Sequence, residues 1–175
     1  MRYGVQALNE ISITRGDQGM GSFEIYVNDV MLTVVQGDGI LISTPTGSTA
    51  YNLSCGGSIV HIAAQVICLT PICPHSLSFR PIILPADRCH IKIKLSKQSR
   101  QSSAKITVDG QVNFAIKSSE VLSIQQSDTQ VPFLKWKSDK TDKIWSDKLN
   151  NQLKWNTTVM ENGSRLPLCA RKAKL

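Results

Sequence analysis

The sequence predicts a mainly β protein whose short strands form a layered β-sandwich, and three observations support this prediction. Apolar and polar residues alternate along several short runs between Asn9 and Asp128, as expected for strands with one buried face. Turn signals at Asn28-Asp29 and Asp109-Gly110 separate pairs of these runs. The chain has 175 residues, 41% of them hydrophobic, so it can bury a core. Many short strands joined by regular turns are typical of β-sandwiches.

The expected strands follow one another closely along the chain. They are expected at 11–14, in a hairpin over 22–36 after a glycine-rich turn, at 40–43, at 91–95, in a second hairpin over 106–116, and at 121–125. The run 40-ILIS-43 is short and apolar enough to be buried on both faces. The preceding Gly37-Asp38-Gly39 predicts a turn.

Two helices interrupt the strand pattern. Ser48 is a suitable N-cap for a short helix over 49–55, and Gly56-Gly57 can end it. Trp145, Leu149 and Leu153 recur every four residues and predict an amphipathic helix. We therefore expect a β-domain over residues 1–131, a C-terminal helix over 132–159 docked on it, and a flexible basic tail over 160–175.

The net charge of +7 is unevenly distributed. From Pro132 onward, ten basic residues stand against four acidic residues, a balance of +6. The charge predicts a solvated helix and tail, and a basic RNA-binding domain is the alternative. No apolar stretch is long enough to cross a bilayer, and residues 1–10 lack the apolar core of a signal peptide. We expect a soluble, cytoplasmic chain without membrane partners.

The five cysteines show no paired spacing, so reduced thiols in a cytosolic protein are expected. The alternative is a zinc site drawn from Cys68, Cys73, His75, Cys89 and His90. These residues lack the C-x-x-C spacing that structural zinc sites favour, so we expect no metal ligands.

The stretch 36-QGDGILISTPTGSTAY-51 is the strongest candidate for a ligand site. Gly47 would let a ligand approach the backbone, nearby hydroxyls can hydrogen-bond, and Tyr51 offers a face for stacking. A ribose, a phosphate or a base edge would fit, and an ordinary capped helix is the alternative. The stretch matches neither the Walker A nor the Rossmann glycine pattern. Asp38 and Asn9-Glu10 are open to both interpretations, as turn residues or as ligand-binding side chains.

Four segments in series resemble the NAD kinase family. They are 7-ALNE-10, 36-QGDGILISTPTGSTAYNLSCGG-57, 69-LTPICPHSLSFRPIILP-85 and 107-TVDGQ-111. Members of the family phosphorylate the 2′-hydroxyl of the NAD adenosine ribose with ATP and produce NADP. The resemblance identifies the chain with the family's C-terminal, NAD-binding domain, which is a layered β-structure.

The resemblance implies binding residues and no catalytic residue in this chain. The implied dinucleotide-binding residues are Asn9, Glu10, Asp38, Thr46, Thr49, Ala50, Tyr51, Ser54, Cys73 and Gln111. Asn9 and Glu10 would hold the ribose and adenine side of NAD, and Asp38 would contact dinucleotide bound mainly by a neighbouring subunit. The chain is thus expected to act as a homo-oligomer, dimer or tetramer, or with a separate N-terminal kinase domain.

The family's catalytic Gly-Gly-Asp-Gly-Thr motif does not occur in the sequence. Gln36-Gly37-Asp38-Gly39 is followed by Ile40, so Asp38 is interpreted as a binding residue. We expect the isolated chain to be inactive, with ATP and Mg²⁺ binding only together with the missing domain. Three explanations stay open: a fragment of a longer enzyme, a split protein with a partner chain, or a non-catalytic NAD-sensing or oligomerisation module.

Overall fold

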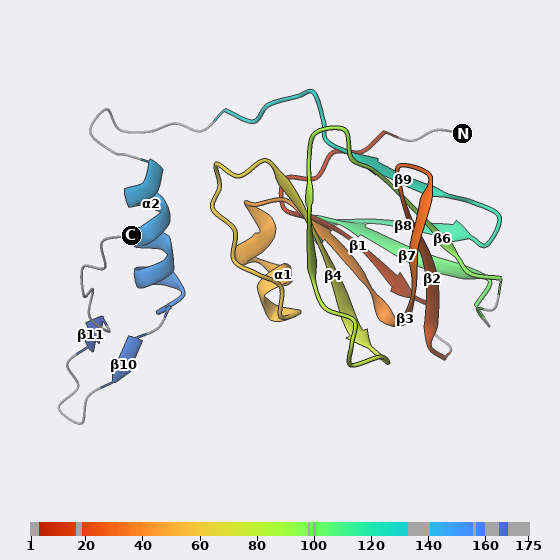
Figure 1. Ribbon diagram of the computed structural model, residues 1–175, viewed down its shortest axis with the longest axis horizontal. Coiled ribbons are helices and arrows are strands. Elements are labelled where there is room, and N and C mark those ends of the chain that lie inside the picture. Colours follow the sequence, from red (N-terminus) through yellow and green to blue (C-terminus); the bar gives the residue numbers. More distant parts are fainter. Residues whose placement is uncertain are drawn as a thin grey trace. The chain divides into compact units, whose positions relative to one another are not determined.

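The computed structural model describes residues 4–16, 19–97, 99, 101–132, 141–155, 157–159 and 165–167. Its contacts divide the chain into two units, 1–130 and 131–175, which are described separately. The strands of the first unit are β1 (Glu10–Arg15), β2 (Gly21–Val27), β3 (Val30–Ser43), β4 (Val66–Pro74), β5 (Ile82–Pro85), β6 (His90–Leu95), β7 (Ser103–Val108), β8 (Val112–Lys117) and β9 (Leu122–Gln125). The mainly β prediction is confirmed (Figure 1).

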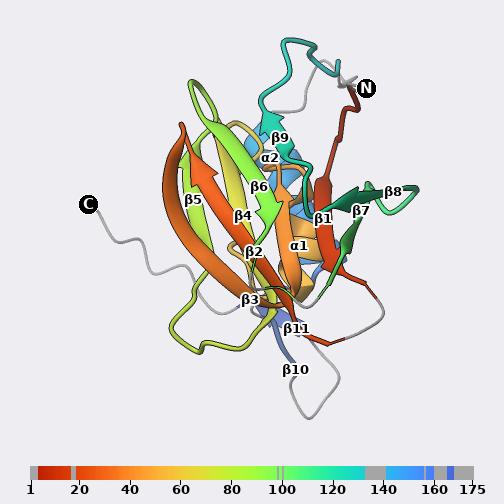
Figure 2. The same cartoon turned by 90° about the vertical axis from the view of Figure 1, so that its right-hand side faces the viewer.

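All nine strands belong to one antiparallel sheet with the order β8-β7-β1-β3-β2-β6-β9, in which β4 pairs with β3 and β5. The long strand β3 is the branch point. Its first half pairs with β2, and residues 39–43 lie between β1 and β4. The sheet therefore curves round on itself and is nearly closed (Figure 2).

The core lies on the concave side of this sheet and follows the predicted alternation. In β6, Ile91, Ile93 and Leu95 are buried, and the intervening lysines are partly exposed. Phe23 and Ile25 of β2 are fully buried next to them. Because side chains alternate across a strand, this pattern fixes the face of β2 and β6 that turns inward.

Both predicted hairpin turns are confirmed by register and backbone conformation. Val27 pairs with Val30 across Asn28-Asp29, and Val108 pairs with Val112 across the Asp109 turn. The turn residues have positive φ, at 50° and 66° in the first turn and 46° and 70° in the second. Asparagine, aspartate and glycine tolerate this left-handed region, which explains why these dipeptides give a strong signal.

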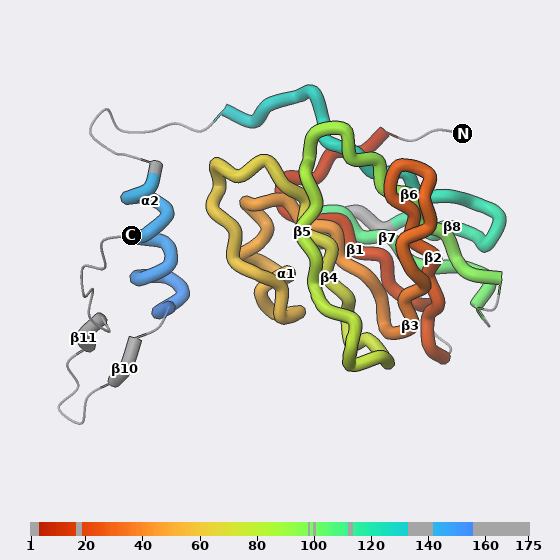
Figure 3. The backbone as a smooth tube through the Cα atoms, viewed as in Figure 1, coloured from red at the N-terminus to blue at the C-terminus, as the bar shows by residue number. Residues whose placement is uncertain are grey.

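The predicted turn at Gly37-Asp38-Gly39 is wrong, because these residues lie inside β3. The course of β3 among β1, β2 and β4 can be followed in Figure 3. The two glycines serve close packing between strands. A Cβ on Gly37 would lie 2.7 Å from the carbonyl oxygen of Cys73, and one on Gly39 would lie 2.3 Å from that of Ile13. The motif is therefore a place where neighbouring strands approach closely.

The predicted short helix exists as a 3₁₀ turn, η1 (Gly47–Thr49), followed by α1 (Tyr51–Ser54). Gly56 has a φ of 77°, and the amides of Gly56 and Gly57 donate to the carbonyls of Leu53 and Asn52. This is a Schellman ending, as the glycine pair predicts. Ser48 as N-cap is wrong, because it lies inside η1 and its hydroxyl donates back to Pro45.

The second unit contains α2 (Thr141–Asp147), the π-helical segment η2 (Lys148–Gln152) and a hairpin of β10 (Thr157–Val159) with β11 (Arg165–Pro167). Helix is thus observed over 141–152, while 157–159 is a strand where helix was predicted. Leu149 is buried as the amphipathic pattern predicts. Residues 160–164 and 168–175 of the expected tail lie outside the described residues. Among the helices that are described, none is long and apolar enough to span a membrane.

Candidate functional site

The topology of the sheet brings three of the sequence motifs to one place. Strand β1 is antiparallel to both β3 and β7, so its start lies beside the ends of those two strands. Glu10 is paired with Ser43, and Ile11 is paired with Val108. As a result, Asn9-Glu10 lies between the segment after β3, which contains Thr46 to Tyr51, and the β7–β8 turn, which contains Gln111.

The segment after β3 is bonded directly to the start of β1. The Thr44 amide donates to the Asn9 carbonyl at 2.9 Å, and the Thr44 hydroxyl donates to the Leu8 carbonyl at 2.6 Å. Gly47 packs against the same backbone, since a Cβ there would lie 2.1 Å from the Asn9 carbonyl oxygen. The glycine of the 46-TGSTAY-51 segment therefore allows contact with another part of the chain.

The β7–β8 turn is hydrogen-bonded to residues 8–10 on the side opposite Thr44. The carboxylate of Asp109 accepts hydrogen bonds from the amides of Leu8, Asn9 and Glu10 at 2.8, 2.8 and 2.9 Å. The Asp109 amide in turn donates to the Glu10 carbonyl at 3.0 Å. The backbone of residues 8–10 is thus bonded on both sides.

Glu10 has a carboxylate oxygen that is buried without a hydrogen-bond partner among the described residues. This atom is Oε2, and it is the only buried carboxylate oxygen in that condition in the described part of the chain. Burial, followed by the negative charge of Asp109, raises the pKa of Glu10 above its ordinary value. A buried acceptor without a donor is costly and rare, so this oxygen is suited to accept a hydrogen bond from a ligand.

Three backbone amides of the 46–51 segment donate to acceptors in residues 44–47. The amides of Gly47, Ser48 and Ala50 donate to the Thr44 hydroxyl, the Pro45 carbonyl and the Gly47 carbonyl. These three amides already have acceptors in the fold, which argues against a phosphate cradle made from them. Of the predicted residues here, Thr46, Thr49 and Ala50 are half-buried, and Ser54 is exposed on α1.

Tyr51 is partly exposed and interacts with two of the remaining predicted residues, Asp38 and Cys73. Its side chain is 42% exposed. Partial burial, followed by interaction with the Cys55 thiol, raises the pKa of Tyr51, and Cys73 and Asp38 add smaller contributions. Burial raises the pKa of Cys55, the hydrogen bond with Tyr51 lowers it, and the smaller contributions of Cys73 and Glu10 raise it. Tyr51 therefore lies near the Cys55 thiol and within electrostatic reach of Asp38 of β3 and Cys73 of β4.

Asp38 is paired with Arg15 on the neighbouring strand. Arg15 Nε lies 2.7 Å from Asp38 Oδ1, with both side chains between a third and a half exposed. The pair borders a shallow hollow of about 450 Å³ lined also by Met20, Cys73 and His75. The structure thus places Asp38 and Cys73 together, and the role of Asp38 toward a second subunit stays a prediction.

Sequence reasoning missed a buried polar centre beneath the site, formed by Asn52. This side chain is fully buried and accepts from the Thr70 hydroxyl at 2.7 Å, while its amide donates to the carbonyls of Ser48 and Ser58. A Cβ on Gly57 would lie 2.2 Å from Asn52 Oδ1. Only the position of Asn52 directly after Tyr51 hinted at this role. The role of Asp109 was also missed, because a place in a hairpin turn was a sufficient reason for an aspartate at this position.

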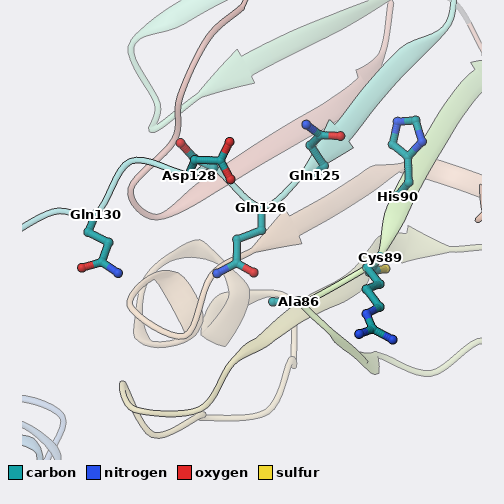
Figure 4. Close-up of a pocket in the computed structure, with 9 residues that line it drawn as sticks. Ala86, Cys89, His90, Gln125, Gln126, Asp128 and Gln130 are labelled. Atoms are coloured by element: carbon teal, nitrogen blue, oxygen red, sulfur yellow. The ribbon is translucent and has the colours of Figure 1, made fainter.

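Two other kinds of site receive no support. No group of three or more His, Cys, Asp or Glu side chains suited to a metal ion exists among the described residues, which leaves the zinc alternative without a cluster. A second hollow of about 560 Å³ lies between the start of β6 and the segment at and after the end of β9. Its lining includes Cys89, His90 and Asp128 (Figure 4). None of the predicted binding residues lines it.

Comparison with known proteins matches this chain to kinases of pyridine dinucleotides. The family profile described as ATP-NAD kinase C-terminal domain matches residues 8–136. The ATP-NADH kinase YEF1 of Saccharomyces cerevisiae is 40% identical over 150 residues, which cover 85% of this chain and 29% of the yeast protein. The chain thus spans less than a third of the length of this relative.

Two solved structures share the fold. A yeast NADH kinase complexed with NADH superposes with a TM-score of 0.69 and 33% identity, covering 89% of this chain and 46% of the other. An NAD kinase from Archaeoglobus fulgidus in complex with ATP gives a TM-score of 0.62 and 26% identity, covering 70% of this chain and 46% of the other.

Proposed function

Since the chain belongs to the ATP-NAD kinase family through its C-terminal domain, we propose that its β unit is the NAD-binding part of an NAD kinase. Such an enzyme transfers a phosphoryl group from ATP to the 2′-hydroxyl of the NAD adenosine ribose and yields NADP. The observation that carries the proposal is the buried, unpartnered oxygen of Glu10 at the junction of three motifs.

The proposed roles follow from the chemistry of each side chain. Glu10 accepts a hydrogen bond from a ribose hydroxyl, because an ionised carboxylate is acceptor-only. Asn9 lies beside it and offers both a donor and an acceptor. Tyr51 presents a partly exposed ring for stacking. The walls of the site are formed by Thr46, Thr49, Ala50, Ser54, Cys73 and Gln111.

We assign the phosphoryl-transfer step to residues outside this sequence. The sequence contains no Gly-Gly-Asp-Gly-Thr motif, which carries the catalytic aspartate in the family that the chain resembles. Asp38 is bonded to Arg15, so its carboxylate already has a cationic partner. Contact of Asp38 with dinucleotide in a neighbouring subunit is part of the proposal.

Calorimetric titration of the chain with NAD tests the proposal directly. We expect saturable binding, and about tenfold weaker binding by Tyr51→Ala, since stacking on an aromatic ring contributes roughly 1–3 kcal/mol per base. Trp155→Ala is the matched control, because Trp155 is an exposed aromatic residue of the second unit. This variant should bind NAD with the affinity of the wild type. A folded chain that binds no NAD would overturn the proposal.

A second assay addresses catalysis. We expect no ATP-dependent formation of NADP by the isolated chain at high concentration, followed with a coupled dehydrogenase. Activity that disappears in Asp38→Asn would show that Asp38 is the catalytic base and that the chain carries its own chemistry.

A further inference from the structure

We propose that Asp109 is a positioning residue for dinucleotide recognition, which fixes the backbone of residues 8–10 and thereby the direction of the Glu10 carboxylate. This inference rests on the proposed function. Asp109 itself is not assigned a contact with the dinucleotide. Its three hydrogen bonds to consecutive amides are the observation that carries the inference.

The β2–β3 hairpin provides an internal comparison, because Asn28 occupies the same turn position as Asp109. Both residues begin a turn with positive φ, at 50° and 46°. Asn28 donates its amide to the His90 carbonyl and accepts the His90 amide on Oδ1, both at 2.9 Å. Asp109 makes the same pair of bonds with Glu10. One side-chain acceptor, which asparagine supplies, is therefore sufficient for this kind of turn.

The carboxylate at position 109 provides more than the turn requires. Beyond the bond to Glu10, it accepts the amides of Asn9 on Oδ1 and Leu8 on Oδ2. An asparagine would present an NH₂ group in place of one of these oxygens, opposite an amide donor. The second oxygen thus serves the segment before β1, and hydrogen bonds to an ionised acceptor are the stronger kind.

This clamp acts on the group proposed to bind the ribose. Thr44 holds the carbonyls of Leu8 and Asn9 from the other side, so the segment has little freedom to turn. Glu10 leaves this segment with its Oε2 atom buried and unpartnered. Preorganisation of this kind lowers the ordering cost of binding, and a looser segment would weaken recognition.

The test combines Asp109→Asn and Asp109→Gly with the control Asn28→Gly. Glycine and asparagine both tolerate the positive φ, so the turns can form in all three variants. For Asp109→Asn we expect about tenfold weaker NAD binding, the fold-change that corresponds to about 1.4 kcal/mol. Asp109→Gly should weaken binding at least as much, and Asn28→Gly should leave the affinity unchanged. Unchanged affinity in both Asp109 variants would overturn the proposal.

Two readouts separate positioning from a merely structural role. Amide hydrogen exchange should accelerate at Leu8 and Asn9 in Asp109→Asn and stay slow at Ile25 in the core. The pH dependence of NAD binding should also move. Among the described residues, Asp109 is the charged group that acts on Glu10, and Glu10 in turn interacts with the Cys55 thiol. Loss of the Asp109 charge should shift the acidic midpoint of binding to lower pH, whereas an unshifted midpoint with unchanged exchange would contradict the clamp.

Failure of this inference can be distinguished from failure of the proposed function. If the folded wild-type chain binds no NAD, the proposed function is wrong. If the wild type binds NAD and the Asp109 variants bind it equally well, the function stands and the positioning role is wrong. Hydrogen exchange reports on the clamp in either case, because it needs no ligand.

Discussion

Glu10 illustrates how a binding group can weaken the fold that carries it. Its buried oxygen lacks a partner in the described part of the chain, and its pKa is raised by burial and by Asp109. The folded state therefore holds the proton more tightly than the unfolded chain does. Stability contributed by this group falls as pH rises from the ordinary carboxyl range through the folded pKa, and the cost is complete above it.

We therefore expect Glu10→Gln to be more stable than the wild type at pH 7, with the difference vanishing below the unfolded carboxyl pKa. The substitution removes the buried charge, and trade-offs of this sign are common at functional sites. Urea unfolding at several pH values measures the effect. Glu120→Gln, at an exposed position, is the control and should show no such gain. Equal or lower stability of Glu10→Gln at pH 7 would contradict the assignment.

Asn52 has the opposite character, because its polar atoms are satisfied by the fold itself. Alanine at this position would leave the Thr70 hydroxyl and the carbonyls of Ser48 and Ser58 without their partner. We expect Asn52→Ala to lower the free energy of unfolding by roughly 2–4 kcal/mol, since buried unpaired groups cost about 1–3 kcal/mol each and cavity formation adds to this. Chemical denaturation measures it. Ser54→Ala, exposed on the same helix, should change stability by less than about 0.5 kcal/mol.

Contacts between turns and strands bring the sequence motifs together. Among the described glycines, Gly47 makes the closest such contact, with the Asn9 backbone. A methyl group there would lie 2.1 Å from the Asn9 carbonyl oxygen, so backbone must move. We expect Gly47→Ala to weaken NAD binding and to lower the melting temperature. Gly4→Ala is the matched control, because no atom lies within 4 Å of its added Cβ. Wild-type affinity in Gly47→Ala would show that the contact between the two motifs is dispensable.

Elements with a local signal were predictable from sequence. The two hairpins follow from residues that tolerate positive φ at their turns, and β6 follows from its strict alternation. The end of α1 follows from Gly56. In each case the physical cause lies within a few neighbouring residues, so the sequence alone contains the information.

Elements that depend on distant neighbours were not predictable. The glycines of β3 resemble a turn, and only the strands beside them show that they serve close packing. Strand β4 contains Pro71 and ends in Pro74, which obscured it as a strand. It pairs with β5 only over Val66–Leu69, so Pro71 faces an open edge where the missing amide is tolerated. The hydrogen bonds that the Asp109 carboxylate accepts from the amides of residues 8–10 were not predictable either, because only the sheet topology brings these distant residues together.

Across the chain as a whole, the candidate site and the excess charge fall in different units. Every predicted binding residue lies between Asn9 and Gln111, within the first unit. Most of the positive charge lies beyond Pro132. Gln6 also bonds Ser127 and Thr129, so the two ends of the described β unit are tied together inside it. The site and the basic segment can therefore be tested separately.

A chain shortened to residues 1–130 provides this test. We expect it to unfold cooperatively and to bind NAD with the affinity of the full chain, because the contacts that build the site are all retained.

Titration of both chains with a single-stranded RNA at two salt concentrations tests the alternative of a basic RNA-binding domain. Neutralising phosphates by lysine or arginine makes such binding fall steeply with salt. RNA affinity that is salt-sensitive and lost on truncation, in a chain that does not bind NAD, would favour that alternative. Loss of NAD binding by the shortened chain would instead show that residues 131–175 contribute to the dinucleotide site.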